Sequence, residues 1–184
     1  MALRPAWQAE EVGALYRAAA AQARLPVFYR SGGVPDTLDG RFDLLSLHLI
    51  LLMCRLREQG REGQVMQQAL FDLLAADMDR NLREMGVGDT GISRRVKAMG
   101  EAFFGRYAAY DAALASSVDV QQAALMTALD KNLYGTVPTE SSQLQRMADY
   151  ARATAAALAA QEDQTILSGK VTFQAYGDDD GGQS

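Results

Sequence analysis

The sequence is poor in the residues that disulfide scaffolds, histidine-containing metal centres and most hydrolase active sites need. Its 184 residues include one cysteine, Cys54, one histidine, His48, and four prolines. One cysteine excludes an intramolecular disulfide, which fits a reducing compartment. No Glu-x-x-His motif occurs, so a di-iron carboxylate bundle is excluded. His48 and Cys54 fall on different sides of one predicted helix, which does not suit a nucleophile and its base. We interpret His48 as a core-facing or partly exposed side chain and Cys54 as a small packed one.

The sequence also lacks a long hydrophobic run and a targeting segment. The longest apolar stretch, residues 44–53, is interrupted by Ser46 and His48 and is too short to span a bilayer. The N-terminus has neither the apolar core nor the cleavage site of a secretory signal. We therefore expect a soluble, cytoplasmic protein that touches the inner membrane only peripherally. The formal net charge of −5 argues against a dedicated nucleic-acid binder but leaves room for a local basic patch.

What the sequence does contain favours α-helices. Hydrophobic residues make up 48% of the chain, enough for a core, but aromatic residues only 8%, so methyl groups and methionine must do much of the packing. Few prolines and few β-branched residues fit helices. Apolar residues recur at helical spacing in six segments. The predicted helices cover residues 6–23, 40–59, 63–85, a segment from Thr90 to beyond Tyr107, 118–132 and 141–161.

Two short segments are predicted to be extended. Residues 25–29 form a connector because Pro26 disfavours a helix start, and residues 165–173 have the composition of a strand whose only candidate partner is that connector. The fold class is therefore all-α, a single-domain bundle of about six helices with a short β appendage near the C-terminus. The predicted division is a helical domain at 1–161, an extended segment at 162–177 and a disordered acidic tail at 178–184.

Charge is distributed unevenly between the third and fourth predicted helices. Residues 61–89 carry six acids and three bases, a net charge of −3, whereas residues 90–114 carry four bases and two acids, a net charge of +2. The two segments either pair with each other or offer a partner a surface of two signs, which would help encounter and orientation. The residues alone leave both alternatives open.

Four carboxylates of the third helix allow three interpretations: a solvated helix face, an acidic patch for a partner, or a metal or acid–base site. They are Asp72, Asp77, Asp79 and Glu84. The segment that follows, Gly86-Val87-Gly88-Asp89, lacks the preceding strand, the third glycine and the lysine of nucleotide-binding loops. We interpret it as a tight turn in which Asp89 or Thr90 caps the next helix, with an anion-binding nest as the alternative.

Two hydrophobic features have both a structural and a binding interpretation. Phe103 and Phe104 are adjacent, so they cannot point the same way on a helix, and one of them should lie at the edge of the core, where it could line a groove. Four methionines either fill an aromatic-poor core or provide adaptable contacts for apolar segments of a partner. They are Met66, Met78, Met85 and Met99.

Read as a whole, the chain resembles the ubiquinol–cytochrome c chaperone family, over roughly residues 10–150. In the second helix the matching residues are Phe42-Asp43 and Leu47-His48-Leu49. In the third helix and its turn they are Gln68, Leu70, Phe71-Asp72, Asp77-Met78-Asp79, Leu82-Arg83-Glu84 and Gly86-Val87-Gly88-Asp89. In the fourth they are Val96, Lys97, Met99, Ala102-Phe103, Gly105-Arg106 and Tyr110-Asp111. The order and spacing of these pieces are more specific than any single piece. No long N-terminal extension precedes the matching region, and in this respect the sequence resembles bacterial members of the family.

The resemblance implies a helical chaperone with no catalytic residues and no cofactor, which binds newly made or unassembled cytochrome b and promotes assembly of the bc1 complex. In mitochondrial members it also implies a small helical partner and contact with the ribosomal tunnel exit. We expect the binding surface at the charged stripes, and we expect Arg83 and Glu84 to matter most. Its residues would be Asp72, Asp77, Asp79, Arg83, Glu84 and Asp89, with Arg94, Arg95, Lys97 and Arg106 beside them.

Two other functions remain open at this stage. The carboxylates of the third helix could serve a metal-dependent enzyme, or the bundle could be a helical adaptor for an unrelated protein. An amphipathic groove between helices would serve a chaperone without any chemistry.

Overall fold

The computed structural model describes residues 6–177, and this part of the chain is entirely helical, with eight α-helices and no strand. The all-α class is thus confirmed, with two more helices than expected, both short. The helices are α1 (Ala6–Ala23), α2 (Pro26–Arg30), α3 (Leu38–Arg57), α4 (Gly60–Glu84), α5 (Asp89–Leu114), α6 (Val118–Asn132), α7 (Ser141–Ala159) and α8 (Asp163–Leu167).

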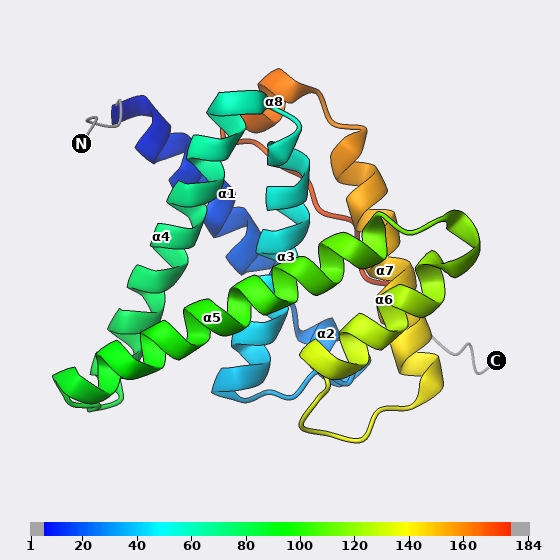
Figure 1. Ribbon diagram of the computed structural model, residues 1–184, viewed down its shortest axis with the longest axis horizontal. Helices are drawn as coiled ribbons and strands as arrows, with labels where there is room; N and C mark the ends of the chain where they lie inside the picture. Colours follow the sequence, from blue (N-terminus) through cyan, green and yellow to red (C-terminus); the bar gives the residue numbers. More distant parts are fainter. Residues whose placement is uncertain (1–5, 178–184) are drawn as a thin grey trace.

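Helix α3 is the centre of the bundle. It packs against α1, α4, α5 and α7, and α5 crosses it on the near side in Figure 1. Its residues 44–53 are buried all round, which explains why the segment is apolar on every side rather than amphipathic. Thr37 caps its N-terminus by accepting a hydrogen bond from the backbone N–H of Gly40 at 3.1 Å. Helices α4 and α1 lie on one flank of α3, and α6 and α7 on the other.

The extended connector predicted at residues 25–29 is wrong, because the segment forms α2. Pro26 occupies the first turn of that helix, where its missing N–H costs nothing and its fixed φ suits the helix. Phe28 is fully buried, so tertiary packing stabilises a helix of five residues that would not persist alone.

The predicted β appendage is also wrong within the described residues. Residues 163–167 form α8, and residues 168–177 continue without regular structure back across the core (Figure 1). With α2 helical, the segment has no strand to pair with. The side chain of Gln161 instead mimics a strand neighbour, because its amide donates to the carbonyl of Thr172 at 2.8 Å and accepts from the N–H of Thr172 at 2.9 Å.

His48 lies in a buried aromatic cluster beneath this C-terminal segment. Its Nδ1 is 2.8 Å from the Leu44 carbonyl oxygen and its Nε2 is 2.7 Å from the Tyr150 hydroxyl. The rings of Phe28 and Phe173 contact it edge-on at centroid distances of 5.3 and 5.5 Å. Burial lowers the pKa of His48 to about 4, so the ring is neutral at pH 7. The core-facing interpretation of His48 is confirmed.

Cys54 lies at the α3–α5 contact and is mostly buried. Burial and the nearby Asp111 carboxylate raise the pKa of its thiol to about 11, and Sγ lies 3.7 Å from an oxygen of Asp111. A protonated thiol is a poor nucleophile and a poor metal ligand. The packed interpretation of Cys54 therefore stands.

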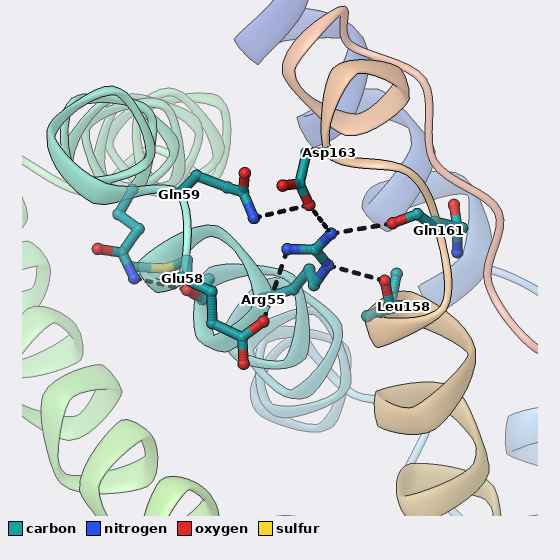
Figure 2. Close-up of polar contacts among 8 residues, drawn as sticks. Arg55, Glu58, Gln59, Leu158, Gln161 and Asp163 are labelled. Carbon is teal, nitrogen blue, oxygen red and sulfur yellow. Dashed lines mark hydrogen bonds and ion pairs between the residues drawn. The ribbon is translucent and has the colours of Figure 1, made fainter.

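A buried arginine fastens α3 to α7 and α8. Figure 2 shows the Arg55 guanidinium between the end of α7 and Asp163. Its Nε donates to the Leu158 carbonyl and Nη2 to the Gln161 carbonyl, each at 2.9 Å, and Nη2 also pairs with Asp163. Arg55 is only 6% exposed. A cation at the C-terminus of α7 gives the carbonyls of Leu158 and Gln161 a charged donor and suits the negative end of the helix dipole.

Candidate partner-binding surface

Four of the predicted binding residues lie where α4 turns into α5, at the lower left of Figure 1. We call Asp79, Arg83, Glu84 and Asp89 the charged corner. Helix α4 ends with Gly86 in the left-handed region at φ 78°. The N–H of Val87 donates to the Leu82 carbonyl at 3.1 Å, which closes the helix end. The N-cap of α5 is Gly88, and no side chain caps it. The prediction that Asp89 or Thr90 caps α5 is therefore wrong, and Asp89 is bound elsewhere.

Arg83 organises this corner by bridging the two helices. Its Nε donates to Asp79 and its Nη1 to Asp89, each at 2.7 Å. The two hydrogen bonds raise the pKa of the guanidinium, which is charged throughout the accessible range. All three side chains are at least 40% exposed, so this network adds little to stability. It fixes the direction of three charged groups at the surface, and the neighbouring Glu84 is also exposed.

The other predicted acids of α4 point along or away from this corner. Asp77 is turned toward α1, where it accepts a hydrogen bond from the Tyr16 hydroxyl at 3.0 Å and pairs with Arg80. Burial, together with the Asp77 carboxylate, raises the pKa of Tyr16. Asp72 is exposed and accepts from Gln68 at 2.8 Å, one turn earlier. The structure thus brings Asp79, Arg83 and Asp89 together and separates Asp77 from them.

The predicted cations of α5 fall into two groups. Arg94 and Arg95 are exposed and form no ion pair with any residue of the described range, and Lys97 lies 3.9 Å from Glu101. Arg106 points inward. It pairs with Asp43 at 2.7 Å, donates to the Asn132 carbonyl, and its guanidinium carbon lies 5.7 Å from the Phe42 ring centroid. Arg106 therefore holds α5 against α3 and α6.

The sequence left open whether the acids of α4 pair with the bases of α5, and the structure shows no such ion pair within the described residues. Asp77 and Asp79 pair with arginines of their own helix, and the α4–α5 pair that does form joins a base of α4 to an acid of α5. Arg94 and Arg95 consequently remain available at the surface. Within residues 6–177, no group of three His, Cys, Asp or Glu side chains lies close enough to hold a metal ion.

Beside the charged corner, α4 and α5 enclose an apolar groove of about 400 Å³ that the sequence did not fully reveal. Phe42, Leu74 and Met78 line it from α3 and α4. Val96, Met99, Gly100 and Phe104 line it from α5, with Lys97 and Glu101 at its edge. Apart from those two residues, every side chain that lines the groove is apolar.

Phe104 is the main exposed apolar side chain of this groove. It is 54% exposed, whereas its neighbour Phe103 is fully buried, so the prediction that one of the pair lies at the core edge and lines a groove is confirmed. The Phe104 ring stacks on Phe71 at a centroid distance of 4.7 Å. Exposing an aromatic ring to water is unfavourable, which is why such a site commonly marks a contact surface.

The groove continues past this aromatic pair into a second hollow of about 230 Å³ with a more polar lining. Phe71 and Phe104 line both hollows. The second one adds Gln64, Gln67 and Gln68 of α4, and Tyr107 of α5. Gln67 is engaged, since its amide donates to the Met53 carbonyl at 2.5 Å.

The four methionines are divided between the core and the surface. Met66 and Met78 are buried, and Met78 lines the groove. Met99 is half-buried in the groove wall, and Met85 is 60% exposed at the end of α4, on the side away from the groove. Core filling and surface presentation are thus divided among the four side chains.

Comparison with known proteins assigns this bundle to a family. The model of the family described as ubiquinol-cytochrome C chaperone matches residues 30–173. The chain belongs to the ubiquinol-cytochrome C chaperone family. The matched region contains the charged corner, the groove and the Arg55 contacts, so all three belong to the family domain rather than to an addition.

Individual relatives agree with this assignment. The crystal structure of the Cbp3 homolog from Brucella abortus superimposes with a TM-score of 0.79 at 29% identity, over 91% of this chain and 90% of that one. Ubiquinol-cytochrome-c reductase complex assembly factor 1 of Xenopus laevis is 23% identical over 80% of this chain, and its counterpart in Drosophila melanogaster is 24% identical over 86%. The aligned regions span 72% and 62% of those two proteins, and 48% of the human one.

No helix within residues 6–177 is long and apolar enough to cross a membrane.

Proposed function

We propose that this protein is a non-catalytic assembly factor for the ubiquinol–cytochrome c reductase complex and that it binds cytochrome b before the subunit is assembled. The observation that carries the proposal is the apolar groove of α4 and α5 beside a charged corner, in a chain of the chaperone family. The names of the relatives support the same complex as the destination of the client.

The physical task of such a factor matches these two features. A membrane subunit that has not yet inserted exposes apolar helices, and covering them requires burial of apolar area but no bond chemistry. A groove with Phe104 exposed supplies that area. The fixed charges of Asp79, Arg83 and Asp89 act over a longer range and would orient the client during encounter. A client that must be released suits a surface of this modest size.

The proposal is tested by removing the corner without disturbing the fold. In cells lacking the gene, we expect wild-type protein to restore b-type haem in the membranes, measured by reduced-minus-oxidised spectra. Arg83→Ala combined with Glu84→Ala should restore clearly less at equal protein abundance, because both residues are exposed and carry little of the stability.

A matched control lies on α7. Asp149 and Arg152 form an exposed pair at 3.2 Å on a helix that does not line the groove, and replacing both with alanine makes the same change in side-chain number and net charge. This control should behave as wild type. A deletion strain with a normal bc1 complex would overturn the proposed function itself.

A further inference from the structure

The groove between α4 and α5 has the dimensions and lining of a site for a single helix. We propose that it holds one uninserted apolar α-helix of the client, laid along α4, over roughly two thirds of the length needed to span a bilayer. The identity of the client rests on the proposed function, but the chemistry of the occupant, an uncharged apolar helix, rests on the groove alone.

The length follows from the residues that line α4. They recur on one face from Gln64 through Phe71 and Ala75 to Met78. Fourteen steps at 1.5 Å each give a track of about 21 Å. A helix that crosses the hydrocarbon core needs about 30 Å. The groove therefore covers about four turns of a client helix and leaves the remainder to another surface or to the membrane.

A glycine forms part of the groove wall. Gly100 lines the α5 wall, and a Cβ placed there would lie 3.5 Å from the Phe71 ring, in ordinary contact. Neither packing nor a positive φ requires glycine at this position, and glycine in the middle of a helix is unfavourable. A side chain at this position would occupy the space of the groove. A glycine leaves that space open, and small residues let a second helix approach closely.

The polarity of the groove selects among occupants. The charged side chains that line it are of both signs, because Lys97 and Glu101 of α5 lie 3.9 Å apart. Such a site presents no strong net charge to attract a nucleic acid or an acidic peptide. Its centre is apolar and one end carries the amides of Gln64 and Gln68, which suits an apolar helix with a polar end.

The experiment uses the purified full chain and a fluorescent synthetic peptide. The peptide has about 14 leucine and alanine residues with two lysines at each end, to match the groove length. A second peptide of the same length differs only in a central proline, which breaks the helix. We expect the first to bind and the second to bind at least tenfold more weakly, in fluorescence anisotropy titrations.

Two variants of α5 locate the binding. Gly100→Leu fills the groove and should weaken peptide binding at least about tenfold, a loss that corresponds to about one buried leucine. Gly105→Leu makes the same change on the same helix, at an exposed position with nothing within 4 Å of an added Cβ, and should leave binding within about twofold. Phe104→Ser, at an exposed site, gives an independent loss. Thermal melts establish that all three variants are folded.

The outcomes separate this inference from the proposed function. Equal binding by Gly100→Leu and Gly105→Leu, or equal binding of the helical and proline peptides, would overturn the groove as a helix site. If cells still needed the protein for bc1 assembly in that case, the proposed function would survive. A self-association of the protein that Gly100→Leu abolishes would assign the groove to a second copy of the chain and would likewise overturn the inference.

Discussion

Two sides of the same central helix differ in how completely they are packed. Toward α7, α8 and the C-terminal segment, α3 is closed: His48 has partners on both ring nitrogens and Arg55 is held by two carbonyls and Asp163. Toward α4 and α5, α3 contributes Phe42 to a groove, and the α5 wall of this groove includes the exposed side chain of Phe104. We call these the closed side and the open side.

The difference teaches where stability and function are placed. In the closed side, the polar groups of His48 and Arg55 are buried and hydrogen-bonded, so each of these two side chains is costly to remove. On the open side, Phe104 remains exposed to water, and covering it would release free energy. A chaperone needs both properties, because a rigid support is required for a surface that is left incomplete. Four comparisons test this view.

The largest effect should come from matched phenylalanine truncations. Phe28→Ala in the closed side removes a fully buried ring that contacts His48, Tyr150 and Tyr176, and we expect a loss of about 3–5 kcal/mol in the free energy of unfolding. Phe104→Ala in the open side should cost less than about 0.5 kcal/mol. Urea denaturation of both variants measures the contrast, and similar losses would remove the distinction between the two sides.

A second effect depends on pH and on His48. Its pKa is about 4 in the folded protein and 6.5 ordinarily, so between these values the unfolded chain binds a proton that the folded chain does not. Stability should therefore fall as the pH is lowered from about 6.5 to about 4, by on the order of 3 kcal/mol at the acid end. His48→Gln cannot take up this proton and should flatten the dependence.

An opposing contribution comes from Asp43 in the contact with Arg106. Burial outweighs the attraction of Arg106 and raises the pKa of Asp43 to about 6, so this group favours the folded state as the pH falls from about 6 to 3.8. The wild-type curve contains both contributions. The difference between wild type and His48→Gln in urea titrations isolates the histidine, and parallel curves for the two proteins would show that His48 is not the buried neutral group described above.

A third and smaller effect concerns two neighbouring arginines of α3. Arg55→Met should cost about 2 kcal/mol, because it removes the donor to the Gln161 carbonyl, one of the donors to the Leu158 carbonyl and the partner of Asp163. Arg57 is 51% exposed and pairs with Asp111 at the surface, so Arg57→Met should cost less than about 1 kcal/mol. Equal losses in thermal or urea unfolding would mean that the Arg55 contacts do not fasten α7 and α8.

The open side was easier to anticipate from sequence than the closed side. Helical periodicity and the adjacency of Phe103 and Phe104 already implied long helices and an aromatic residue at a groove, because both signals are local. The charges of α4 and α5 were also visible, but not that Arg106 turns inward, since its partner Asp43 lies on another helix. The face of α4 that lines the groove could have been predicted, because Phe71, Ala75 and Met78 recur at helical spacing on that face.

The closed side depends on contacts between residues far apart in the sequence. Arg55 looked like an ordinary basic residue near the end of α3, and nothing local shows that it reaches carbonyls about 100 residues later. The α2 helix and the irregular path of residues 168–177 have the same origin, because Phe28 and Tyr176 are placed by the core and not by their own segments. Propensity fails where burial decides the conformation.

The smallest effect compares two glycines of α4 and α5. A Cβ at Gly63 would collide with the Leu56 carbonyl at the α3–α4 junction, so Gly63→Ala forces a shift of backbone and should cost at least about 1 kcal/mol. Gly100 has room for a Cβ beside Phe71 and lies within a helix, so Gly100→Ala should raise the free energy of unfolding by about 0.5–1 kcal/mol. A stabilised Gly100→Ala protein would show that this glycine is kept for something other than the fold. If Gly100→Ala instead unfolds more easily, the space beside Gly100 has no room for a methyl group. The groove would then have no room for a partner at this point of its α5 wall.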